Sequence, residues 1–425
     1  MRQWTMYLLL LSASVSADPA QWNNNLTLDQ VIINVLEKNP TLNAAGFESK
    51  AAAARIRAER MSPALKTSLE LENFAGSGVM GGTDNIESTL RLSRVIELGD
   101  KAELRGKVAH QQALLLRNEQ DARRLDLLAE ATRRYIHVVT DQQRLIIAKE
   151  SLAIAEKIQQ VARRRVAAGK SAEAELRRVT ITVARKKLEV DHAIHELASS
   201  RLKLSIMWAE VKPAFNEATA ELFKTGPVTS FEELSRRLEH NPDLLRYATE
   251  QRLSYSRQQL IESDGQPDIE ISGGLRHFNT TDDTGLVMSL NFPLGSKSRA
   301  APRKQEVELM RLKEPFLYEE RKLELYATLF EVYQESQHAR DALSSLRETI
   351  IPQAAKALKD YEKGYAAGRY SFLELTEAQN TLIESRLEAV MRAADYHRYQ
   401  IEIDRLTGAG LVNSMSADQI SGVKQ

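Results

Sequence analysis

The sequence predicts a mainly α-helical protein with a small β part, built from one structural unit that occurs twice. Three observations lead to this prediction. Motifs in the first half return about 200 residues later. Long stretches have the periodicity of helices, and four shorter segments alternate apolar and polar residues as strands do.

The returning motifs divide the chain into two repeats, which we place at residues 18–225 and 226–410. Asn39-Pro40 returns as Asn241-Pro242, Leu98-Gly99 as Leu294-Gly295, and Ala167-Ala168-Gly169 as Ala366-Ala367-Gly368. Two copies of one unit suggest a pseudo-symmetric object. Its function is then expected to follow from what that object encloses.

Composition excludes several classes of function. The chain of 425 residues has 58 basic and 58 acidic side chains, so no net field attracts nucleic acid. It has no cysteine, which excludes disulfides, thiolate chemistry and a lipidated N-terminal cysteine. Ala, Leu, Glu, Arg and Lys dominate, as in long helices and coiled coils.

The N-terminal residues 1–17 are predicted to be a secretory signal peptide. Arg2 supplies a basic start, Met6–Leu11 an apolar core, and Val15-Ser16-Ala17 a cleavage site of small residues. A buried N-terminal helix is the alternative. No later stretch reaches the ~18 consecutive apolar residues of a membrane-spanning helix. We therefore expect an exported protein, and a flexible C-terminal tail at residues 411–425.

Each repeat begins with two helices separated by the Asn-Pro motif. The residue before proline is disfavoured in helical geometry, so the first helix is expected to end there. The helices are predicted at Leu28–Lys38 and Leu42–Arg60 in repeat 1, and at Phe231–His240 and Leu244–Glu262 in repeat 2.

Four strands of about ten residues follow from the alternating segments. They are predicted near residues 64–74 and 87–98 in repeat 1, and 267–278 and 284–294 in repeat 2. Their length and two-faced pattern suit a transmembrane β-barrel, although a half-buried soluble sheet has the same pattern. Four strands cannot close a barrel, which needs ~8, and open edges are not tolerated in lipid. Three chains would provide twelve strands.

Long helical hairpins are predicted at residues 101–208 and 303–407, each turning at a glycine, Gly169 or Gly368. The returning helices carry apolar residues every seven positions, which indicates coiled-coil packing. These are Leu176, Val183, Val190, Leu197 and Leu204, and then Leu375, Leu382, Ala389, Tyr396 and Ile403. Ser371 and Glu374 have the spacing of a capping box.

Two motifs that resemble functional sites are better explained as structure. Gly76–Gly81 matches the dinucleotide-binding fingerprint, but a second strand follows it instead of a helix, so we expect a flexible loop. His192, His195 and Glu196 lie near one another on a helix without an evident further ligand, which favours a solvated face. No catalytic constellation is apparent, so we expect no enzyme, no metal site and no cofactor.

Glu374 and Glu377 are the strongest candidates for a functional pair. They lie three residues apart just after the second turn, so they share one face of the helix. Carboxylates at a helix N-terminus are favoured by the helix dipole in any case. If the helices line a tube, symmetric copies of both residues would instead form acidic rings, which select ions.

The chain resembles the TolC family of outer-membrane efflux channels over essentially its whole length. The resemblance rests on the duplicated order of elements and on the motif Tyr365–Leu375. Ser93–Lys101 and Leu290–Leu294 are similar to the CzcC-type branch, which exports divalent heavy-metal cations such as cobalt, zinc or cadmium. The resemblance implies a homotrimer in the outer membrane of a Gram-negative bacterium, with a twelve-stranded barrel and an α-helical tunnel.

The resemblance also implies partners and site residues. Such channels dock on a periplasmic adaptor and an inner-membrane pump of the RND type. The residues that close the tunnel correspond to Tyr365, Glu374 and Glu377, whereas Tyr370 stands where some members have a gating arginine. Adaptor contacts are expected at the two turns, which consist of Ala168, Gly169, Lys170, Ala367, Gly368 and Arg369.

Other functions remain open at this point. The same architecture would serve efflux of drugs or other small molecules, or type I secretion. A periplasmic adaptor also has a long helical hairpin, but only one, flanked by a split β-domain. A coiled-coil scaffold would not need the signal peptide or the four strands. The sequence therefore favours a passive exit duct.

Overall fold

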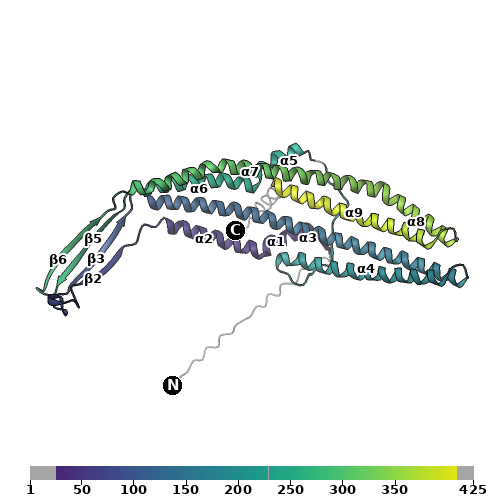
Figure 1. Ribbon diagram of the computed structural model, residues 1–425, viewed down its shortest axis with the longest axis horizontal. Coiled ribbons are helices and arrows are strands. Elements are labelled where there is room, and N and C mark those ends of the chain that lie inside the picture. The colour runs from purple at the N-terminus through teal and green to yellow at the C-terminus, as the bar shows by residue number, and fades with distance from the viewer. Residues whose placement is uncertain (1–24, 228, 409–425) are drawn as a thin grey trace, which may run out of the picture.

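The computed structural model describes residues 25–227 and 229–408. The predicted signal peptide and C-terminal tail lie outside the described residues. The molecule is elongated, with a β-sheet at one end and two helical hairpins at the other (Figure 1). This architecture confirms the predicted fold class, a mainly helical protein with a small β part.

Each Asn-Pro motif begins a helix, and its asparagine side chain also forms a hydrogen bond at the end of another helix. Helix α1 (Leu28–Lys38) ends at Asn39, whose side chain caps α2 (Pro40–Glu59) by accepting from the Thr41 amide at 2.9 Å. The Asn39 amide donates to the Met207 carbonyl, beyond the end of the returning helix, at 2.7 Å. Proline at the first helical position is well tolerated because its missing N–H has no helical partner there.

Repeat 2 reproduces this arrangement. Helix α5 (Phe231–Arg237) ends in a 3-10 turn (Leu238–His240), and Asn241 caps α6 (Pro242–Asp264). The Asn241 amide donates to the Leu406 carbonyl at 2.8 Å. The Asn-Pro motif therefore joins each repeat's short helices to its own returning helix.

The four strands form one antiparallel sheet in the order β2-β3-β5-β6. They are β2 (Lys66–Glu72), β3 (Glu87–Ile96), β5 (Ile269–Phe278) and β6 (Asp283–Asn291). The loop with the dinucleotide-like motif joins β2 to β3 and contains only a three-residue 3-10 turn, Gly78–Met80. A separate short pair, β1 (Asn25–Leu26) with β4 (Glu217–Ala218), is parallel.

The sheet has one apolar and one polar face. The register aligns one leucine from each strand in a row across the apolar face, and all four are exposed: Leu69 67%, Leu90 54%, Leu275 52% and Leu286 84%. On the other face, Arg276 contacts Glu72 at 2.8 Å and Glu87 at 2.9 Å, which links β2, β3 and β5. Since cross-strand neighbours share a face, this alternation persists over all four strands.

Two helical hairpins extend from the sheet. In repeat 1, α3 (Lys101–Ala167) returns as α4 (Glu173–Ser205). In repeat 2, α7 (Ser296–Ser345) passes through a short π-helical segment (Leu346–Ile350) into α8 (Ile351–Ala366) and returns as α9 (Phe372–Thr407). The five predicted heptad residues of α9 are all buried.

The second hairpin differs from the sequence prediction at its start. Helix α7 begins at Ser296 rather than near residue 303, and it contains Pro302 and Pro315. Each proline removes one backbone hydrogen bond, and a long helix with other contacts tolerates that loss. Among the described residues, no helix is both long and apolar enough to cross a membrane.

The hairpins pack around separate apolar clusters. One large cluster lies around Tyr135, Trp208 and Val390, where α1, α3 and α9 meet the β1–β4 pair. A second includes Ile158, Leu358 and Leu375 and fills the space between the two hairpins towards their tips. This second cluster positions the candidate site.

Candidate functional site at the helical tips

The two tips have the same turn. Gly169 and Gly368 both have positive φ, 67° and 79°, where other residues are strained. The amide of the next residue bonds back to the helix end in each case, Lys170 to Arg165 at 2.8 Å and Arg369 to Gly364 at 2.8 Å. The predicted adaptor-contact residues of both turns are exposed, at the end of the molecule farthest from the sheet (Figure 1).

Tyr365 lies between the tips and is only 1% exposed. It is in the last turn of α8, and its hydroxyl donates to Glu175 Oε1 on α4 at 2.5 Å. Burial raises the pKa of the Tyr365 phenol, and the Glu175 carboxylate raises it further. The phenol therefore stays protonated and remains a donor at neutral pH.

Arg165, in the last turn of α3, contacts the same tyrosine from repeat 1. Its Nη1 donates to the Tyr365 carbonyl, and its guanidinium carbon lies 4.7 Å from the centre of the Tyr365 ring. Neither Arg165 nor Glu175 was among the residues predicted from sequence for this site. Their pairing with Tyr365 joins positions 200 and 190 residues apart, which no local pattern signals.

Glu374 and Glu377 lie on the exposed start of α9. The predicted capping box is confirmed, since Glu374 Oε2 accepts from the Ser371 amide and hydroxyl, each at 2.8 Å. These hydrogen bonds from Ser371 lower the pKa of Glu374. The structure thus places both glutamates at the surface, whereas Tyr365 is held inside the packing between the tips.

Tyr370 has a packing role in its own hairpin. Its ring lies over Gly364, where an added Cβ would be 2.1 Å from Tyr370 Cδ2. The ring also lies 4.7 Å from that of Tyr361, centre to centre. Tyr370 therefore stabilises the second tip internally, and Gly364 leaves the space it needs.

Further contacts join the two hairpins on the side of the tips that faces the sheet. Lys157 on α3 pairs with Glu362 on α8 at 2.8 Å, and Arg386 on α9 pairs with Glu150 on α3. In the buried layer between them, the Gln379 side chain donates to the Ser151 carbonyl at 3.3 Å. The tips are therefore held by charged contacts outside and by apolar packing inside.

Comparison with known proteins identifies this architecture. The sequence matches the outer membrane efflux protein family over residues 31–210 and again over residues 234–409. The chain belongs to this family. The second match means that both halves of the chain carry the family's sequence pattern.

Known proteins are similar to this chain along most of its length. The cobalt-zinc-cadmium resistance protein CzcC of Cupriavidus metallidurans (strain ATCC 43123 / DSM 2839 / NBRC 102507 / CH34) is 26% identical over 403 residues, covering 93% of each chain. The solved structure of CusC has a TM-score of 0.73 at 15% identity, covering 89% of this chain and 91% of CusC. VceC of Vibrio cholerae has a TM-score of 0.71 at 16% identity, covering 90% and 96%. The fold is that of outer-membrane channels.

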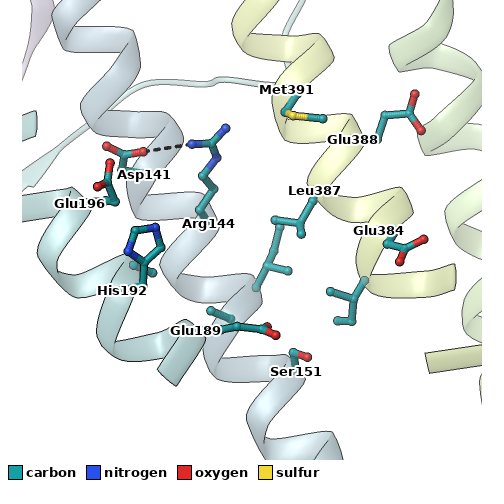
Figure 2. A pocket seen from close by; sticks show the side chains of 14 residues that line it. Asp141, Arg144, Ser151, Glu189, His192, Glu196, Glu384, Leu387, Glu388 and Met391 are labelled. Atoms are coloured by element: carbon teal, nitrogen blue, oxygen red, sulfur yellow. Dashed lines mark ion pairs between the residues drawn. The ribbon is translucent and has the colours of Figure 1, made fainter. Parts of the chain in front are cut away.

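The efflux-family fold leaves a groove between α3, α4 and α9, with a volume of about 700 Å³ (Figure 2). Asp141, Arg144, His192 and Glu196 lie in its wall, and Arg144 Nη1 is 3.6 Å from Asp141 Oδ1. His195 is not part of this lining. Over residues 25–227 and 229–408, no group of three or more His, Asp or Glu is arranged to hold a metal ion.

The junction of sheet and helices accounts for the Ser93–Lys101 motif. Lys101 is buried, and its Nζ bonds to Asp268 Oδ1 at 2.6 Å and to the Gln266 carbonyl at 2.9 Å, before β5. Gly99 packs on the Gln266 side chain and has a φ of 80°, a backbone conformation in which other residues are strained. Repeat 1 thereby fixes the start of repeat 2's first strand.

Proposed function

We propose that this protein is the outer-membrane exit duct of a three-component RND-type efflux system, formed by three copies of the chain. The main support for this proposal is that both edges of the four-stranded sheet are unpaired in the described part of the chain. Among the described strands, β2 and β6 are paired on one side only. In lipid, unpaired strand edges are unfavourable, so the sheet requires further strands.

Three copies of the four-stranded sheet would supply twelve strands and leave no edge. The exposed leucine row would then face lipid, and the face with Arg276 and its glutamates would face the lumen. Helix α3, with 67 residues, extends about 100 Å, so the barrel would continue as a long tunnel through the periplasm.

The tips are the proposed end of the tunnel and its gate. Tyr365 holds the two hairpins together, while symmetric copies of Glu374 and Glu377 would bring six carboxylates to the opening. The exposed turns at Gly169 and Gly368 are the proposed contacts for a periplasmic adaptor, since glycine allows another helical tip to approach closely. An inner-membrane pump would deliver the substrate.

We assign divalent heavy-metal cations as the substrate class. Support comes from the 26% identity to the cobalt-zinc-cadmium resistance protein over 93% of both chains. An acidic opening would favour such cations over anions. The protein itself supplies a path and a gate, and the pump supplies the driving force.

Two measurements test this function. In cells lacking the gene, we expect loss of tolerance to cobalt, zinc or cadmium with unchanged drug tolerance, restored by the gene. In wild-type cells, membrane fractionation and crosslinking should give trimers in the outer membrane. A soluble monomer would contradict the duct, and loss of drug tolerance alone would contradict the metal substrate.

A further inference from the structure

The tip of repeat 1 forms a socket for one residue of repeat 2. We define the socket as Arg165, Ser171 and Glu175. Arg165 Nε donates to Ser171 Oγ at 3.1 Å, and Ser171 Oγ donates to Glu175 Oε1 at 3.2 Å. Because Tyr365 bonds Glu175 through its hydroxyl and Arg165 through its carbonyl, the four residues form a closed ring of hydrogen bonds.

Within this ring, Arg165 makes the contacts that do not depend on the tyrosine hydroxyl. It bonds to the main chain of Tyr365, and its guanidinium lies near the ring. Its positive charge sits at the C-terminal end of α8, where helix carbonyls carry partial negative charge. The donors of a planar guanidinium point in fixed directions. Arg165 can therefore bond the Tyr365 carbonyl and Ser171 at the same time while its guanidinium lies near the tyrosine ring.

The socket exists in one repeat only. Under the offset of 199 that relates Gly169 to Gly368, Arg165 corresponds to Gly364 and Tyr365 to Val166. Gly364 cannot be replaced by an arginine without displacing Tyr370, which occupies its space. Val166 has no hydroxyl. The tip of repeat 1 therefore binds a tyrosine of repeat 2, whereas repeat 2 has no equivalent socket for a residue of repeat 1.

We propose that Arg165 is the positioning residue of the gate: it holds the end of α8 in the socket, and the tip opens only when Arg165 releases the Tyr365 carbonyl. This inference rests on the proposed gate at the tips. Removal of the tyrosine hydroxyl leaves both Arg165 contacts in place. Loss of Arg165 is therefore expected to open the channel more than loss of the hydroxyl.

Single-channel recordings of purified trimers in planar bilayers test this inference. Arg165→Gln should raise the open fraction by more than about tenfold and by more than Tyr365→Phe does, because it removes two charge-assisted hydrogen bonds and the ring contact. Arg165→Lys should lie between wild type and Arg165→Gln, because it keeps the charge but not the fork. Arg164→Ala is the matched control, since the exposed neighbouring Arg164 bonds the Gln160 carbonyl of its own helix.

The outcomes separate the inference from the function on which it rests. If Arg165→Gln gates like wild type while Tyr365→Phe opens the channel, Arg165 is not the positioning residue and the gate stands. If Arg165→Gln opens the channel no more than Tyr365→Phe does while its trimers melt normally, the Arg165 contacts do not hold the tip and the inference is overturned. If wild-type trimers form no pore, the proposed function itself fails.

Discussion

The hydroxyl of Tyr365 lies 2.5 Å from Glu175 Oε1, so the last turn of α8 is fixed to the first turn of α4. Comparison of the two repeats explains why the Glu175 carboxylate is available to bond Tyr365. Glu374, its counterpart, caps its own helix with Ser371. At the equivalent position in repeat 1 stands Ala172, which has no hydroxyl to donate, so Glu175 Oε1 accepts from the hydroxyls of Tyr365 and Ser171 instead.

Replacement of Tyr365 by phenylalanine should weaken the closed tip. The hydrogen bond to a charged acceptor contributes about 1.5–3 kcal/mol, and its loss should raise the open fraction in bilayer recordings. Tyr361→Phe is the control, because the Tyr361 ring packs at an angle against Tyr370 within repeat 2. Equal gating of the two variants would contradict the role of the Tyr365 link.

The double variant Glu374→Ala, Glu377→Ala should raise conductance and reduce block by divalent cations. Each trimer would lose six exposed carboxylates at its opening, and with them the local attraction for cations. Conductance and block by added cobalt or zinc measure the effect. Glu173→Ala, at the start of α4 and paired with Arg177, is the control. Unchanged conductance and block in the double variant would eliminate the proposed ring.

Ser371→Ala should shift the pH dependence of this block. The Ser371 hydrogen bonds hold the pKa of Glu374 below its ordinary value of 4.5, so wild-type Glu374 stays ionised as the pH falls through that value. A lowered carboxyl pKa contributes stability at higher pH and loses it in acid. Ser371→Ala keeps the amide donor and removes the hydroxyl donor, so the pKa of Glu374 should rise only part of the way to its ordinary value. Protonation should then begin at higher pH, and block should be lost earlier on acidification.

The same variant tests the cap itself. Removal of an N-cap serine costs about 1 kcal/mol of stability, so the melting temperature at neutral pH should fall slightly. Ser298→Ala provides a comparison, because Ser298 bonds the Gly295 carbonyl near the start of α7 instead of capping α9. Identical pH profiles for both variants would show that Ser371 does not tune Glu374.

Leu286→Lys should prevent insertion of the barrel, whereas Val287→Lys should be tolerated. The two residues are neighbours on β6 but lie on opposite faces, and Leu286 belongs to the exposed leucine row. A lysine on the lipid face costs about 2–4 kcal/mol at the membrane midplane. Heat-modifiable trimers in outer-membrane fractions measure the result. Equal trimer yields would contradict the assignment of the apolar face.

The sequence by itself determined the elements and their duplication, because these depend on local patterns. Alternation over Ser88–Leu98 predicts β3 and its two faces, and heptad spacing predicts the buried side of α9. The capping box at Ser371 was also predictable, since its partners are three residues apart. The start of α7 was placed too late, because proline usually marks a helix end and here lies inside one.

Only the tertiary structure decided what joins the repeats. No sequence pattern distinguishes Arg165 or Glu175 from other polar residues of their helices. Packing of the two hairpins brings both to Tyr365. Likewise, no local pattern distinguishes Lys101 from an ordinary first-turn lysine, but the fold buries it beside Asp268. A local pattern records which face of an element is apolar. It does not record which partner a polar side chain meets, because that depends on the geometry of the whole packed chain.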